Sequence, residues 1–168
     1  MPALPTQPGS YALHLFLDSD RPLEVGKLGI FQLPAGHYVY LGSAHGPGGL
    51  QARLKRHLNS QGTQHWHIDW LRHVSRLMAV FYSTEAAQSE RQPLECCWSQ
   101  ALAALPGATI PVRRFGAGDC QLRCSAHLVA FPAEAMTSPG RGFGWALEAC
   151  GAKVSQIRVV GQSPPFAG

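Results

Sequence analysis

The sequence predicts an α+β fold, in which a small, mainly antiparallel sheet is flanked by helices. Tyr11, Leu13, Leu15 and Leu17 alternate with Ala12, His14 and Phe16, which is typical of a strand. A short turn at residues 34–36 separates two further strand-like segments. Apolar residues recur at helical spacing along residues 47–59 and 93–105. With 168 residues, of which 45% are hydrophobic, the chain has about the size of one domain and can bury a core.

The first half of the chain is expected to hold most of the sheet. Its expected elements, in order, are a loose leader at 1–8, strands at 11–17, 27–33 and 37–41, and a helix at 47–59. A polar break at residues 18–22 ends the first strand. The turn at residues 34–36 is so short that the strands on either side of it should pair as an antiparallel hairpin.

The second half alternates helices with strands. Its expected elements are a helix at 64–75, a strand at 77–82, a helix at 93–105, a strand at 126–131, a short helix at 144–150 and a strand at 154–160. Pro93 suits the first turn of its helix, where a backbone N–H would have no partner. The chain becomes rich in Pro, Gly and Ser from about residue 133. We therefore expect a domain at 9–132 and a C-terminal extension of unknown role at 133–168.

Composition bears on location and on partners. No apolar run approaches the ~20 residues that a membrane span needs, and the N-terminus lacks the basic start and apolar segment of a signal peptide. We expect a cytoplasmic protein with no membrane partner. The cysteine count is odd, at five, which does not indicate a disulfide framework. Residues 45–76 hold five basic residues and one acidic residue, and this basic patch hints at a polyanionic partner.

The helix at 47–59 carries an arginine on its apolar face. Leu50, Leu54 and Leu58 recur at helical spacing and mark the buried face, from which Arg53 and His57 also project. A guanidinium beside a core needs an anion to compensate its desolvation, and a phosphate suits its planar fork because two oxygens can bind at once. The alternative is an arginine that reaches solvent or pairs with an internal carboxylate.

Several short segments carry a resemblance to a known family when they are taken together and in order. They are Gly9-Ser10-Tyr11, Val25–Gly29, Gly36–Ala44, Leu50–His57, His65–Asp69 and Glu95. This order resembles the GIY-YIG nuclease superfamily, and more closely its small stand-alone Uri-superfamily endonucleases, over roughly residues 9–131. Twenty-eight residues separate Tyr11 from Tyr40, more than in typical superfamily members, so the comparison implies an inserted hairpin.

The resemblance implies a divalent-metal-dependent DNA endonuclease that leaves 5′-phosphate and 3′-hydroxyl ends. It makes Tyr11 the general base and Tyr40 a residue that positions water or phosphate. It makes Arg53 the clamp on the scissile phosphate and His57 a second phosphate contact or proton donor. Glu95 would bind a single Mg²⁺, or Mn²⁺ in its place, with waters filling most other positions. Since a phenol has a pKa near 10, Tyr11 would need the positive charge of Arg53 and of the metal nearby.

Other residues are expected to contact nucleic acid. They are Ser43, Lys55, Arg56, His65, His67 and Arg72. Plainer interpretations stay open: Tyr11 and Tyr40 as surface strand residues, and Glu95 as a helix-capping carboxylate. The alternative function is a non-catalytic nucleic-acid-binding module on the same fold, which would bind DNA without Mg²⁺. The sequence is silent on substrate structure and on oligomeric state.

A second group of residues suggests a different metal. Cys120, Cys124 and His127 lie within eight residues of one another and could form part of a zinc site. A fourth ligand would be needed, and the candidates are Cys96, Cys97, His65 and His67. The simpler interpretation is packed cysteines, with Asp119 and His127 in local hydrogen bonds.

Overall fold

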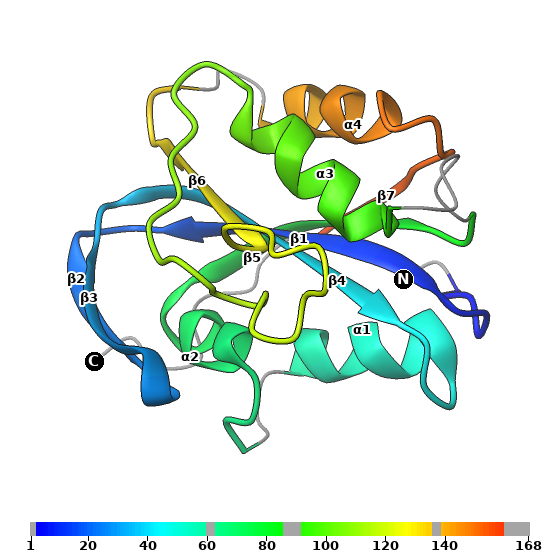
Figure 1. The fold of residues 1–168 in the computed structure, drawn as a ribbon, viewed down its shortest axis with the longest axis horizontal. Helices are drawn as coiled ribbons and strands as arrows, with labels where there is room; N and C mark the ends of the chain where they lie inside the picture. The colour runs from blue at the N-terminus through cyan, green and yellow to red at the C-terminus, as the bar shows by residue number, and fades with distance from the viewer. Residues whose placement is uncertain (1–2, 60–62, 86–91, 136–138, 160–168) are drawn as a thin grey trace.

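The computed structural model describes residues 3–59, 63–85, 92–135 and 139–159. Its centre is a five-stranded antiparallel sheet with helices on both faces (Figure 1). In spatial order the strands are β6 (Leu128–Pro132), β4 (Gly36–Ala44), β1 (Gly9–Leu17), β5 (Arg76–Ser83) and β7 (Ser155–Arg158). The predicted α+β class is confirmed.

Both faces of the sheet are covered. The helices are α1 (Gly49–Asn59) and α2 (His67–Val74) on one face, and α3 (Leu94–Ala103) and α4 (Pro139–Glu148) on the other (Figure 1). Because successive strand residues point to opposite faces, Leu13 and Leu15 pack into the core under α1 and α2, while Ala12 packs into the core with Trp98 and Phe143. None of the helices in the described part of the chain has the length and apolar character that a bilayer crossing requires.

The connection between β1 and β4 is a separate hairpin. β2 (Arg21–Val25) pairs with β3 (Gly29–Leu33) through the 3₁₀ turn Gly26–Leu28, which agrees with the inserted hairpin that the resemblance implies. The predicted pairing of the strands on either side of residues 34–36 is wrong, because β4 pairs with β1 and β6 instead. The polar break at 18–22 ends β1 at Leu17, as predicted, and β2 begins within it at Arg21.

The N-terminal segment holds the start of α1. The first N–H groups of a helix have no partner within the helix. Here the N–H of Leu50 donates to the carbonyl of Gln7 at 3.0 Å, and the N–H of Gln51 donates to the carbonyl of Pro5 at 2.8 Å. Leu4 is buried. The expected loose leader is therefore wrong for residues 4–7, whereas residues 1–2 lie outside the described residues.

Residues 139–159 belong to the same sheet and core. β7 pairs with β5, α4 packs on α3, and a disulfide links Cys97 in α3 to Cys150. Residues 139–159 of the expected extension thus share a core with the expected domain. The sequence did not indicate a disulfide framework, and this one disulfide leaves Cys96, Cys120 and Cys124 as free thiols. The last residue of the strand expected at 154–160 lies outside the described residues.

Candidate functional site

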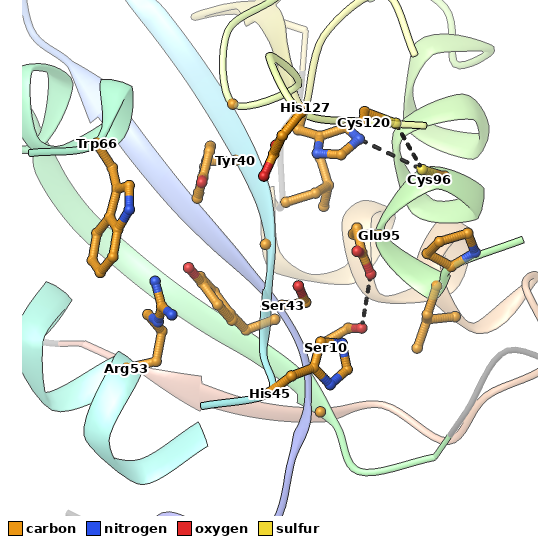
Figure 2. A pocket seen from close by; sticks show the side chains of 18 of the residues that line it. Ser10, Tyr40, Ser43, His45, Arg53, Trp66, Glu95, Cys96, Cys120 and His127 are labelled. Carbon is orange, nitrogen blue, oxygen red and sulfur yellow. Dashed lines mark hydrogen bonds between the residues drawn. The ribbon is translucent and has the colours of Figure 1, made fainter. Parts of the chain in front are cut away.

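A cleft of about 1210 Å³ opens at the end of the sheet where β1 begins and β4 ends. It is lined by most of the residues predicted for the site: Tyr11, Tyr40, Ser43, Arg53, His65, His67 and Glu95. Figure 2 shows Arg53 and Trp66 on one side of this cleft and Glu95 and Cys96 on the other. The cleft therefore has a cationic wall formed by α1 and an acidic wall formed by α3.

Tyr11 lies at the base of the cleft and contacts His57. Its hydroxyl lies 2.9 Å from Nε2 of His57, and both side chains are only 2% exposed. Gly42 on β4 leaves room for this ring, since a Cβ there would lie 2.5 Å from the Tyr11 hydroxyl oxygen. The neighbouring strand therefore helps to set the position of the phenol.

Burial keeps this pair uncharged. Desolvation raises the pKa of Tyr11 well above 10 and outweighs Arg53, which lowers it. Desolvation also lowers the pKa of His57 to about 3, with smaller effects from Asp69 and the nearby arginines. Between the neutral groups, the phenol donates to Nε2 when the imidazole proton is on Nδ1. The positive charge of Arg53 without a metal is therefore not enough to bring the pKa of the phenol toward neutrality.

Tyr40 lies on the same face of the sheet as Tyr11, with ring centroids 6.3 Å apart. Burial raises the pKa of Tyr40 to about 12. Gly116 packs on its ring in a left-handed conformation, with φ of 67°, and a Cβ there would lie 2.7 Å from Cε2 of Tyr40. The N–H of Gly116 donates to Nδ1 of His67 at 3.0 Å. His67 thus connects α2 to the loop that covers Tyr40.

Arg53 is the cation that faces the cleft. Its guanidinium carbon lies 4.2 Å from the centre of the Trp66 ring, and that of Arg56 lies 3.8 Å from the same centre. Arg56 pairs with Asp69 at 2.8 Å, whereas no carboxylate among the described residues lies within ion-pair distance of Arg53. Within the described part of the chain, Arg53 therefore has no internal carboxylate partner, which was the alternative interpretation.

Asp69 fixes the start of α2 beside the cleft. One of its carboxylate oxygens accepts the backbone N–H groups of His65 and Trp66, both at 2.8 Å, and the guanidinium of Arg56. Trp66 is the N-cap of α2, so these bonds resemble half of a capping box. They hold Trp66 where it can support Arg53.

Glu95 lies in the first turn of α3 and is half-buried at the cleft. Its Oε2 accepts a hydrogen bond from the hydroxyl of Ser10 at 3.2 Å (Figure 2). A carboxylate at this end of a helix is favoured by the helix dipole. Because its bond runs to β1 rather than back to the backbone of its own helix, capping does not explain the side chain fully.

Four predicted contacts lie outside this cleft, and two of them are too deeply buried to touch nucleic acid. Arg72 is only 3% exposed, and its guanidinium donates to the carbonyls of His57 and Ser75 at 3.1–3.2 Å. It ties α2 to the end of α1 and has no access to nucleic acid. The burial of His57 likewise excludes a direct phosphate contact in this conformation. Lys55 and Arg56 are exposed on α1 but do not line the cleft.

A family model described as "Domain of unknown function DUF123" matches residues 10–140. The chain belongs to the DUF123 family. The DUF123 match runs from β1 into α4 and includes every predicted site residue. No curated protein and no solved structure matches the chain.

The DUF123 region also gathers a group of metal-ligand side chains that the sequence only partly identified. The thiols of Cys96, Cys120 and Cys124 and a ring nitrogen of His127 all lie within 4.8 Å of one another, and they could bind a metal such as zinc. Of the fourth ligands considered, the structure selects Cys96. Cys97 is used in the disulfide.

The buried histidines of the DUF123 region should make stability depend on pH. His14 and His57 are both 2% exposed, and burial lowers the pKa of each to about 3. In the unfolded chain each binds a proton below about pH 6.5, whereas the folded form does not until about pH 3. As the pH is lowered from about 6.5 to about 3, the free energy of unfolding should therefore fall by about 1.4 kcal/mol per pH unit for each histidine.

Urea unfolding of the wild type and of His57→Asn at several pH values between these limits checks this prediction. For the variant, the slope of the free energy of unfolding against pH should be smaller than that of the wild type by about 1.4 kcal/mol per pH unit, the contribution of one proton. Carboxylates contribute equally to both proteins and cancel in the comparison. Equal slopes would contradict a neutral, buried His57.

Proposed function

We propose that the protein is a divalent-metal-dependent endonuclease that hydrolyses the phosphodiester bonds of DNA. The observation that carries the proposal is the meeting of Tyr11, Tyr40, Arg53 and Glu95, from β1, β4, α1 and α3, in one cleft. These are the residues that match the catalytic positions of the GIY-YIG nucleases. Chance would rarely bring residues so far apart in sequence to one opening.

Arg53 would hold the scissile phosphate. Its guanidinium is braced by Trp66 and has no ion pair among the described residues, so its donors can bind phosphate oxygens. His45 and His65 also line the cleft and offer ring nitrogens to a bound phosphate. A phosphate bound here would supply the negative charge that Arg53 lacks among the described residues.

The Tyr11–His57 pair would move the proton of the attacking water. The phenol oxygen takes a proton from water while its own proton passes to Nε2 of His57. The hydroxide formed attacks phosphorus, the P–O3′ bond breaks, and the 3′ oxygen takes a proton from solvent. His57 then releases its extra proton to solvent, which restores the neutral pair. This path forms no free phenolate, which agrees with the raised pKa of Tyr11, but it charges His57, whose pKa is lowered to about 3, so it needs the negative charge of the bound phosphate nearby to favour the imidazolium. It also gives the buried His57 a role that does not require contact with DNA.

Glu95 is the residue that would hold the metal. Mg²⁺ in nucleic-acid enzymes is bound by one or two carboxylates together with substrate phosphates and waters, so a single glutamate beside a phosphate clamp fits it. When bound, Mg²⁺ would neutralise charge on the phosphate and on the departing oxygen. Ser10 holds the carboxylate toward the cleft through its hydroxyl.

Cleavage of labelled single-stranded, duplex, flap and junction DNA tests the proposal. The wild type should cut at least one of these substrates with Mg²⁺ or Mn²⁺ and none with EDTA. Tyr11→Phe keeps the ring but cannot relay a proton, so its rate should fall by about 10²–10⁴-fold while it still binds DNA. Circular dichroism confirms that the variant is folded.

The same variant guards against a contaminating nuclease, because contamination would give equal rates in both preparations. Equal rates, or tight DNA binding without cleavage under any metal condition, would overturn the proposal. Binding without cleavage would instead identify a non-catalytic nucleic-acid-binding module.

A further inference from the structure

The acidic wall of the cleft contains a cluster that the proposed nuclease chemistry does not use. Cys96 lies in the first turn of α3, and Cys120, Cys124 and His127 come from the loop and strand start that face it. Figure 2 shows Cys96, Cys120 and His127 converging. Segments separated by more than twenty residues thus supply one set of ligand atoms.

Two of the distances between these atoms match those of a tetrahedral zinc site, and the others are at most 4.8 Å. The Cys96 sulfur lies 3.6 Å from the Cys120 sulfur and 3.6 Å from Nε2 of His127. Zn–S bonds of about 2.3 Å and Zn–N bonds of about 2.0–2.1 Å at tetrahedral angles place two sulfurs about 3.8 Å apart, and a sulfur and a nitrogen about 3.6 Å apart. Ordinary core packing of thiols would not require this arrangement.

The surroundings of the ligands are those of a metal site. The backbone of Leu122 and of Cys124 hydrogen-bonds to the Cys120 side chain, and Arg123 adopts a left-handed conformation, with φ of 53°, that turns the chain between the two cysteines. His127 has a hydrogen bond with the backbone of Gly116. Metal-bound histidines commonly hold their other ring nitrogen in this way.

We propose that Cys96, Cys120, Cys124 and His127 bind one Zn²⁺ in a closed, structural site. Four protein ligands leave no open position for water or substrate, so the metal has a structural and not a catalytic role. It joins α3 to the loop that covers Tyr40, and Cys96 is the neighbour of Glu95. The site therefore holds the acidic wall of the cleft in place. Zinc binding itself does not depend on the proposed nuclease activity.

The full chain, purified with a reductant and without chelators, should contain about one zinc ion per molecule by elemental analysis. Replacement by Co²⁺ should give the ligand-field bands of a tetrahedral ion and strong thiolate-to-cobalt charge-transfer bands. Cys124→Ser, on an accessible turn, should lose most of the zinc and weaken the charge-transfer bands. A strong chelator should lower the Tm of the wild type but leave that of Cys124→Ser nearly unchanged.

The double variant Cys97→Ser/Cys150→Ser is the matched control. It removes two cysteines, one of them next to Cys96, and should still bind about one zinc ion with an unchanged cobalt spectrum. Wild-type protein without zinc and without tetrahedral cobalt bands would overturn the proposal. Full zinc content in Cys124→Ser, or loss of zinc in the double variant, would overturn the ligand assignment.

Discussion

Replacing Glu95 with glutamine should abolish metal-dependent DNA cleavage and leave the fold intact. The side chain is half-buried, and its carboxylate accepts a hydrogen bond from the Ser10 hydroxyl. The amide oxygen of the glutamine can still accept this bond. Stability should fall by only about 0.3–1 kcal/mol, from the lost charge at the start of α3. A carboxylate that holds a catalytic metal contributes several kcal/mol to the transition state, so the rate should fall by about 10²–10³-fold or more.

Glu85→Gln is the matched control for this prediction. Glu85 also lines the cleft, but its carboxylate accepts the backbone N–H of Lys153 at 2.7 Å and nothing assigns it to the metal. Single-turnover cleavage with titrated Mg²⁺ should show wild-type behaviour for Glu85→Gln and almost no product for Glu95→Gln. If Glu95→Gln cleaved within about threefold of the wild type, the metal assignment would be wrong.

Most elements could be predicted from the sequence because their signals are local. The strand at residues 11–17 and the helix at 47–59 have clear periods, and β1 and α1 begin or end within two residues of them. The pairing of β3 could not be predicted in this way. β4 pairs with β1, which is far away in the sequence, and β3 pairs with β2 in a separate hairpin. This choice depends on which strand lies at the centre of the sheet, which a local pattern does not reveal.

The candidate site divides in the same way. Arg53 and Arg72 both project from apolar helix faces near a basic patch, and the sequence does not distinguish them. What separates them is the neighbouring element, because Arg72 meets the carbonyls of His57 and Ser75 while Arg53 meets a cleft. A guanidinium next to carbonyls is structural, whereas one that opens onto solvent and lacks an anion is available to a ligand.

The adjacent cysteines show the same limit. Neighbouring residues on a helix point about 100° apart, so Cys96 and Cys97 cannot serve the same site. Which of them joins Cys120 depends on α4, which brings Cys150 to the other side of α3. Only the packed structure provides this information, although the sequence correctly offered Cys96 as one of the candidates.

Replacing Arg53 with alanine should remove cleavage and also weaken DNA binding. The loss of one preorganised donor pair on the transition-state phosphate costs about 10²–10³-fold in rate. The slope of log affinity against log salt should fall by about 0.9, the value for one phosphate contact. Arg53→Lys keeps the charge but not the planar fork, so it should restore the salt slope and much of the binding without restoring the full rate.

Arg56→Ala separates this role from general basic charge and from support of Trp66. Arg56 is on the same helix and its guanidinium also lies over the Trp66 ring, but it pairs with Asp69 and does not line the cleft. At saturating DNA its cleavage rate should stay within about threefold of the wild type, because the backbone N–H groups of His65 and Trp66 still bind Asp69 when the exposed ion pair and phosphate contact of Arg56 are lost. Equal losses in Arg53→Ala and Arg56→Ala would mean that α1 contributes its charge as a whole, and that no single arginine holds the scissile phosphate.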